Sequence, residues 1–167
     1  MKKNILFGMT LFTMLNANTI TLTGKVEVAS IVGFNQAEVE SLNYQTNINA
    51  FNAIEINNAL ELNEYFTITK SIYAKSNSSD DLEIRLESAN FGGQLQATGG
   101  NSIAMKYTID GTVIDMDGET WVTIPTTINQ LTTINNGFTA RSKTPISTYQ
   151  PAGDYSVILN VTVREKI

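Results

Sequence analysis

The acidic segment Asp115-Met116-Asp117-Gly118-Glu119 comes closest of any part of the chain to a metal site. Its Asp-x-Asp-Gly pattern resembles the start of an EF-hand loop, in which carboxylate oxygens bind Ca²⁺. A further ligand before the glycine is missing, and the glutamate that the loop requires at its twelfth position is Thr126 here. We therefore interpret the segment as a solvated hairpin turn that holds no metal.

The chain contains no histidine and no cysteine. This composition excludes thiolate nucleophiles, imidazole general bases, disulfides and zinc sites built from Cys and His. The pair Asp80-Asp81 follows Ser78-Ser79, a context typical of a turn rather than of two catalytic carboxylates. We expect no enzymatic activity and no cofactor.

Two further patterns have a chemical interpretation and a simpler structural one. The triplets Asn77-Ser78-Ser79 and Asn160-Val161-Thr162 match the acceptor pattern for N-glycosylation, to which we give little weight. Trp121 and the six tyrosines have the chemistry of a sugar-binding platform. We expect instead that a sandwich uses its single tryptophan in the core.

The charge balance argues against nucleic acid and anionic membranes as partners. Eleven basic residues face sixteen acidic ones, which gives a net charge of −5 and a pI near 4.7. Both kinds of partner favour a basic surface. Charged residues make up only 16% of the chain and hydrophobic residues 42%, so the 167 residues suit a single domain with a substantial core.

Residues 1–17 have the pattern of a secretory signal peptide. Lys2 and Lys3 form a positive start, an apolar run covers Ile5 to Leu15, and small residues lie around a cleavage point before Asn18. The apolar run is shorter than the roughly 20 residues that span a bilayer. We expect an exported mature chain of 150 residues, in which nine basic and sixteen acidic residues give a charge of −7.

Apolar and polar residues alternate along most of the remaining chain, which predicts β-strands. The clearest runs are Phe66–Ala74, Leu82–Leu86 and Ile103–Ile109. Asp110-Gly111 suits a two-residue hairpin turn, and we expect Asp117-Gly118 to repeat it. Frequent turns and one apolar face per strand predict an all-β sandwich, with room for one short helix within residues 35–64.

Two terminal segments carry long apolar stripes of a single parity. The stripe near the start of the mature chain contains Ile20, Leu22, Gly24, Val26 and Val28. The stripe in the last strand contains Tyr155, Val157, Leu159, Val161 and Val163. On pattern alone these are two ordinary strands of a closed sandwich, or the first is a strand meant for use elsewhere, with Gly24 allowing close approach of a neighbour.

Four motifs occur in an order that resembles alpha-class chaperone–usher fimbrial major subunits, the pilins of colonisation-factor type. The first is Thr19-Ile20-Thr21-Leu22-Thr23-Gly24-Lys25-Val26-Glu27, similar to the family's Asn-Ile-Thr-Val-Thr-Ala-Ser-Val-Asp. The others are Tyr73–Asn77 leading into Asp81–Leu86, Met105–Gly111, and Pro151–Ser156 before the last strand. Where the family often has proline after the acidic residue of the first motif, this chain has Val28.

This resemblance implies an incomplete immunoglobulin-like β-sandwich that is completed by donor-strand exchange. Residues 1–17 are then the signal peptide, 18–32 the N-terminal donor strand and 33–167 the pilin domain. The implied function is that of a structural fimbrial subunit that polymerises head to tail into a bacterial surface fibre used in adhesion. The implied partners are copies of itself, a periplasmic chaperone, an outer-membrane usher and a tip adhesin, with export through the periplasm to the cell surface.

Two other functions stay open at the level of sequence. One is a minor or tip adhesin subunit, although adhesins of this type usually carry an extra lectin domain for which 150 residues leave no room. The other is a self-complete exported β-sandwich that acts as a binding protein. An open sandwich is prone to aggregate when purified alone, whereas a complete one is a stable monomer.

Overall fold

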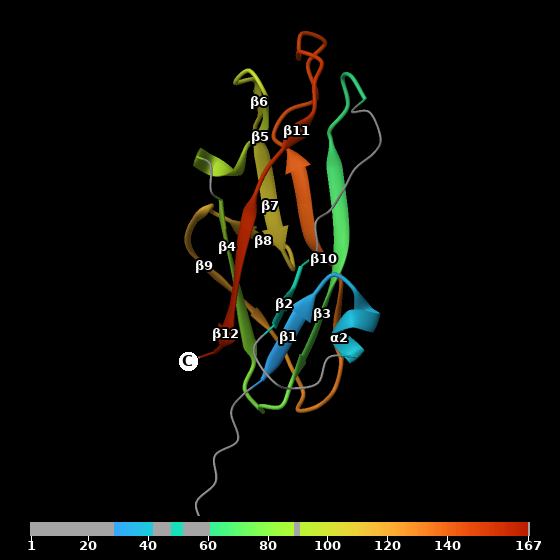
Figure 1. Ribbon diagram of the computed structural model, residues 1–167, viewed down its shortest axis with the longest axis vertical. Helices are drawn as coiled ribbons and strands as arrows, with labels where there is room; N and C mark the ends of the chain where they lie inside the picture. Colours follow the sequence, from blue (N-terminus) through green and yellow to red (C-terminus); the bar gives the residue numbers. More distant parts are fainter. Residues whose placement is uncertain (1–28, 42–47, 52–60, 89–90, 167) are drawn as a thin grey trace, which may run out of the picture.

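The computed structural model describes residues 29–41, 48–51, 61–88 and 91–166, and these residues form an all-β domain (Figure 1). The strands are β1 (Ser30–Gly33), β2 (Ile48–Ala50), β3 (Thr67–Ser76), β4 (Leu82–Ser88), β5 (Leu95–Ala97), β6 (Ser102–Ile103), β7 (Met105–Ile109), β8 (Thr112–Ile114), β9 (Asp117–Ile124), β10 (Thr132–Ser142), β11 (Tyr155–Ser156) and β12 (Leu159–Glu165). The helical elements are α2 (Gln36–Ser41) and the 3-10 turn η1 (Phe91–Gly93). The predicted fold class is thus confirmed.

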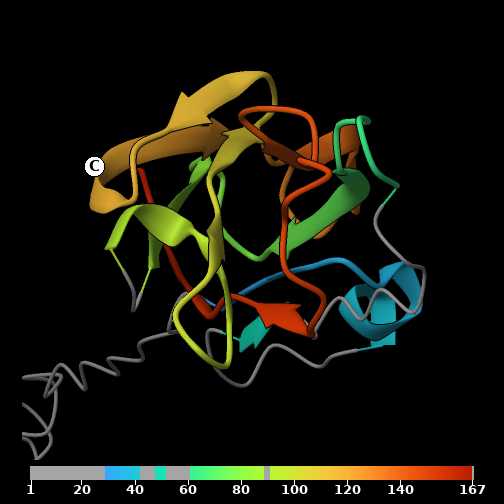
Figure 2. The ribbon, with the colours of Figure 1, turned by 90° about the horizontal axis from the view of Figure 1, so that it is seen from above.

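The strands form two layers. One layer is a six-stranded sheet in the order β2-β1-β3-β10-β7-β8. Two three-stranded sheets, β12-β4-β9 and β11-β5-β6, form the other layer, and the chain passes from one to the other between β11 and β12 (Figures 1 and 2). Neighbouring strands run antiparallel in every described ladder except that of β1 and β2. The arrangement is a sandwich.

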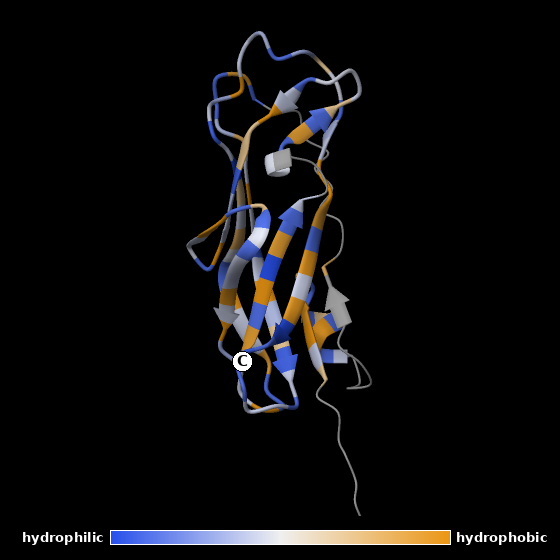
Figure 3. Ribbon diagram, turned by 90° about the vertical axis from the view of Figure 1, so that its left-hand side faces the viewer, coloured by the Kyte–Doolittle hydropathy of each residue, from blue (hydrophilic) through white to orange (hydrophobic). Residues whose placement is uncertain are grey.

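The alternation of the sequence decides which side chains enter the core. Leu82, Ile84 and Leu86 of β4 are buried, whereas the residues between them are half-buried on the outer side. Met105 and Tyr107 of β7 are buried in the same way. Because side chains alternate between the two faces of a strand, one apolar parity is enough to build the core. Figure 3 shows this alternation along the strands.

One of the two predicted hairpin turns is correct. Asp110-Gly111 joins β7 to β8, with φ angles of 47° and 77° that suit this turn. The prediction for Asp117-Gly118 is wrong, because β8 and β9 belong to different sheets and the dipeptide lies at the start of β9. Gly118 has a φ of 80° and is buried against Glu87, where the pairing of β9 with β4 shifts register. The positive φ of Gly118 therefore belongs to a β-bulge and not to a hairpin turn.

A short helix does lie within residues 35–64. The Asn35 side chain accepts a hydrogen bond from the Glu38 amide (3.4 Å), which caps the start of α2. Val39 is fully buried against Ile31 of β1 and fixes the helix on the sheet. The stretch 53–60 lies outside the described residues. No helix in the described ranges is long and apolar enough to cross a bilayer.

The predicted donor strand, residues 18–32, is described only in its last four residues. Ala29 to Val32 are buried, and β1 pairs with β3 from Ser30↔Ser76 to Gly33↔Tyr73. Residues 18–28 lie outside the described residues, so the donor strand itself stays a prediction. Because residues 29–32 are held in the domain's own sheet, we take the predicted donor strand no further than Val28.

Candidate functional site

The last strand of the chain is the edge of its sheet. Residues of β12 pair with β4 from Leu159↔Ser88 to Glu165↔Leu82, and β12 has no other ladder among the described strands. In an antiparallel ladder, alternate residues direct their N–H and C=O groups to one neighbour and the rest to the other side. Among the described strands β12 is thus the edge of its sheet, and sheet edges are the usual places for strand addition.

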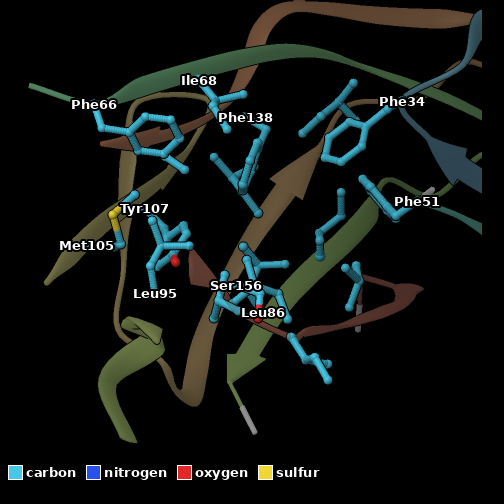
Figure 4. A pocket seen from close by; sticks show the side chains of 18 of the residues that line it. Phe34, Phe51, Phe66, Ile68, Leu86, Leu95, Met105, Tyr107, Phe138 and Ser156 are labelled. Carbon is cyan, nitrogen blue, oxygen red and sulfur yellow. The ribbon is translucent and has the colours of Figure 1, made fainter. Parts of the chain in front are cut away.

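An apolar groove opens beside this edge and leads into the core. Its volume is about 460 Å³, and every described residue that lines it is apolar or aromatic except Ser156 (Figure 4). The packed core of a closed domain has few voids larger than one water molecule, whose share of liquid volume is about 30 Å³. A space of this size can hold a further strand or an apolar ligand.

Aromatic rings gathered from distant parts of the chain line the groove. The Phe34 ring packs edge-on against Phe51 (centroids 4.7 Å apart) and tilted against Phe138 (5.3 Å). Phe138 in turn stacks on Tyr107 (6.3 Å). Figure 4 shows these rings turned toward the cavity from β1, β7 and β10 and from the ends of neighbouring strands. The full aromatic set is Phe34, Phe51, Phe66, Phe138, Tyr107 and Tyr155.

The C-terminal stripe forms one wall of the groove. Tyr155, Val157, Leu159, Val161 and Val163 are each half-buried, whereas Ser156, Ile158, Asn160 and Thr162 are exposed. Val161 lies opposite Leu86, and Val163 lies opposite Ile84, so both face the core. The stripe is half-buried, and β2 is a further described strand that comes close to β12.

Tyr107 fixes a polar group in this apolar wall. Its hydroxyl donates a short hydrogen bond to the Gly93 carbonyl (2.6 Å), and the side chain is only 2% exposed. Burial disfavours the charged phenolate and raises the pKa of Tyr107 to about 12. The groove therefore stays neutral throughout the physiological pH range.

The residues proposed for the donor stripe, Ile20, Leu22, Gly24, Val26 and Val28, lie outside the described residues. In the acidic segment, Asp117 at the start of β9 accepts a hydrogen bond from the Glu119 amide (3.0 Å), and Asp115 is exposed. No group of three or more acidic side chains placed to hold a metal occurs in the described ranges. Asp81 accepts a hydrogen bond from the Thr126 amide (3.1 Å), which joins two loops that are far apart in the sequence.

Trp121 is not in the core, contrary to expectation. It lies on the outer face of β9, half-buried between the guanidinium groups of Arg164 (3.7 Å from the ring) and Arg85 (4.9 Å). Arg164 also pairs with Glu83 (2.8 Å). With an arginine on it from each of two neighbouring strands, the indole acts as a structural surface, not as an open platform for a sugar.

The sequence predicts the wall of the groove that the C-terminal stripe forms, but it predicts only part of the opposite, aromatic wall. The alternation had already assigned Phe66 and Tyr107 to the inner side of their strands. Phe34 and Phe51 each follow a short strand, and no periodic pattern marks them. Only the approach of β1, β2 and β12 in space brings these rings to one opening.

The fold and the groove define a class of protein: an all-β sandwich whose core is open beside an edge strand. No protein-family model and no curated protein sequence matches the chain.

Solved structures that resemble this chain include subunits of chaperone–usher pili. One is a chaperone–usher pilus studied for rod uncoiling (13% identity, TM-score 0.49, covering 89% of this chain and 94% of that one). Another is the P pilus rod subunit PapA (14%, 0.41, 60% and 79%). A third is the CooA pilin subunit from enterotoxigenic Escherichia coli (13%, 0.38, 83% and 86%).

Proposed function

We propose that this protein is a structural subunit of a bacterial surface fibre, in which each copy inserts its N-terminal strand into the groove of the next. The observation that carries the proposal is the apolar groove beside β12, the edge strand of its sheet among the described strands. Such a site suits strand addition, in which backbone hydrogen bonds give affinity and alternate side chains fill the cavity. A groove of this length and shape has little to offer a small polar ligand.

The segment ahead of Ala29 has the length and pattern of the strand that the groove requires. Residues 18–28 span roughly 36 Å when extended at about 3.3 Å per residue, which is longer than the stretch from Tyr155 to Val161 that lines the groove. The inward parity of the segment carries four aliphatic side chains and Gly24. The outward parity carries threonines and charged residues, which suit a solvent-facing side.

The energetics require both side chains and backbone. Burying Ile20, Leu22, Val26 and Val28 at about 1.5–3 kcal/mol each gives roughly 6–12 kcal/mol before losses. Association costs about 4–15 kcal/mol, so side-chain burial alone does not guarantee a durable joint. Backbone hydrogen bonds of the added strand, at a net ~1 kcal/mol each, supply the remaining binding free energy.

The direction of the inserted strand follows from where the chain enters and leaves the domain. We call the loops 77–81 and 125–131 with Ala29 the base end, and the loops 61–66 and 143–154 the tip end (Figure 1). The stretch 155–165 runs from the tip to the base, where the Lys166 amide donates to the Asp81 carbonyl (2.8 Å). Ala29 is also at the base, where its amide donates to the Asn77 side chain (2.8 Å).

Antiparallel insertion therefore joins the base of one copy to the tip of the next and repeats without closing. Parallel insertion would bring two bases together and would favour closed pairs. Antiparallel pairing is also slightly more stable per residue. The head-to-tail fibre is the arrangement that these positions favour.

The same groove explains the remaining partners. Before assembly, an exported subunit exposes an apolar cavity and a strand edge, both of which promote aggregation. A periplasmic chaperone that lends a strand would cover them, and an outer-membrane usher would exchange that strand for the next subunit's segment. A tip adhesin would end the fibre, which would serve adhesion at the cell surface.

The test compares the mature chain with a variant that lacks residues 18–28. We expect the mature chain to form linear polymers in electron micrographs and the variant to remain unpolymerised while binding a synthetic peptide of residues 18–28 in a one-to-one ratio. The control is a peptide of the same composition in scrambled order. A mature chain that is monomeric and ignores the peptide would indicate a self-complete exported sandwich instead.

A further inference from the structure

One leucine and two tyrosine side chains are exposed to solvent at the tip end. Tyr149 is 91% exposed, Leu62 54% and Tyr65 46%. Monomeric proteins expose single apolar residues routinely, but three on adjoining loops at one end are a candidate contact surface. Tyrosine is moreover enriched in protein interfaces.

The loops that carry these side chains are fixed rather than loosely attached. The Asn63 amide donates to the Ile146 carbonyl (2.8 Å), and the Ile146 amide donates to the Glu64 carbonyl (2.8 Å). The Ile146 side chain is buried and anchors this pair of loops in the core. The Arg141 guanidinium lies 4.0 Å from the Tyr65 ring and holds it in place. A preorganised surface loses little side-chain freedom when a partner docks.

The base end carries one exposed aliphatic side chain, Ile128, which is 51% exposed. It lies on a turn closed by a hydrogen bond from the Gln130 amide to the Thr127 carbonyl (2.9 Å). A second bond from the Asn129 amide to the Ser76 carbonyl (2.7 Å) ties the turn to the end of β3. This turn is next to the point where the chain enters the domain at Ala29 (Figure 1).

The occupant of the tip surface follows from the length of the segment ahead of Ala29. Ala29 is buried in the domain's own base, and it directly follows Val28, the last residue of the apolar stripe. An inserted stripe that includes Val28 leaves no residues between the groove and Ala29. A donor copy must therefore bring its base to within a residue or two of the acceptor's tip. We propose that Leu62, Tyr65 and Tyr149 form the docking surface for the base of the next copy, around Ile128.

This end-to-end contact rests on the proposed fibre and adds a second interface to it. The inserted strand supplies the durable joint, and the contact between tip and base limits bending about that joint. The partner is a second copy of this chain, not a glycan or another host molecule.

The test uses the absence of cysteine from the natural chain. One variant combines Tyr149→Cys with Ile128→Cys, and its matched control combines Val113→Cys with Ile128→Cys, because Val113 is similarly exposed (48%) but lies on β8 between the two ends. Polymers of each mature protein are treated with a short bismaleimide, boiled in detergent and separated by size. We expect a ladder of covalent multimers from the first variant and none from the control.

Polymers that form without a ladder would overturn the end-to-end contact and leave the fibre proposal standing. A ladder of equal strength from the control would also overturn it, because the cross-link would then not report the ends. Absence of polymers from the unsubstituted protein would refute the fibre proposal and this contact with it. Unchanged polymers that bind a glycan only when Tyr149 is intact, again without a ladder, would assign the tip surface to a host ligand.

Discussion

The parity of the proposed donor segment offers the sharpest single-residue comparison. Leu22 belongs to the inward set, and its chain neighbour Thr21 belongs to the outward set. Replacing Leu22 with aspartate should prevent joining, because the carboxylate would enter a groove whose described lining contains no charged residue. Thr21→Asp should have little effect, because that side chain would face solvent.

The size of the effect can be worked out from the groove. Leu22→Asp forfeits about 1.5–3 kcal/mol of apolar burial. An unpartnered carboxylate in an apolar site costs at least a few kcal/mol more, unless the group takes up a proton. A total near 4 kcal/mol corresponds to roughly a thousandfold weaker binding at ~1.4 kcal/mol per tenfold.

The assay is competition between peptides of residues 18–28 for the groove of the variant that lacks this segment. The second matched pair is Val26→Asp, inward, and Lys25→Asp, outward, which should repeat the pattern. Equal losses at both parities would mean that the segment does not bind as an extended strand. No loss at Leu22 or Val26 would mean that its apolar stripe does not enter the groove.

Three further substitutions have defined outcomes. Gly24→Leu should block joining through overpacking if the groove wall closes on that position, and the same peptide competition measures it. Tyr107→Phe should cost about 0.5–1.5 kcal/mol near neutral pH by leaving the Gly93 carbonyl unpaired, as urea unfolding would show. In the natural protein burial raises the pKa of Tyr107 to about 12, against 10.0 in the unfolded chain. The contribution of Tyr107 to the free energy of unfolding is therefore complete below pH 10 and falls by about 1.4 kcal/mol per pH unit between pH 10 and 12. Tyr107→Phe should remove this fall from the pH profile of stability. Gly118→Ala should destabilise the domain by about 1–3 kcal/mol, because φ is 80° there and a Cβ would run into the Glu87 side chain, and a denaturant melt that matches the natural protein would contradict this.

The strands were predictable because the alternation of apolar and polar residues is visible in each short segment and decides which side chains enter the core. Once Leu82, Ile84 and Leu86 share a parity, they must share a face, and the core forms on that face. The hairpin at Asp110-Gly111 was predictable for a similar reason, since the dipeptide determines its own turn. The same dipeptide at Asp117-Gly118 forms a bulge instead. The positive φ of its glycine fits the register shift between β9 and β4, which the dipeptide itself does not encode.

Other features depend on strands that are far apart in the sequence. Trp121 lies outside the core because Arg85 and Arg164, from β4 and β12, cover the indole on the outer face, and hydropathy alone does not record such a pairing. The opening beside β12 depends on how strands from distant parts of the chain are arranged around it, which no single segment encodes. Phe34 and Phe51 join the groove only through the approach of β1 and β2 to β12.

The most direct measurement of the central claim fills the groove within one molecule. Because β12 ends at the base and an antiparallel donor strand begins there, a second copy of residues 18–28 can follow the C-terminus through a hairpin linker of about five residues. We predict a soluble monomer stabilised by ~4 kcal/mol or more, which for a domain of this size raises the Tm by about 8–16 °C. The control carries the same extension with Leu22→Asp and Val26→Asp in the appended copy, and it should melt like the unextended protein. An unextended protein that is already a cooperative monomer, with no gain in Tm from the natural extension, would contradict the open-groove account.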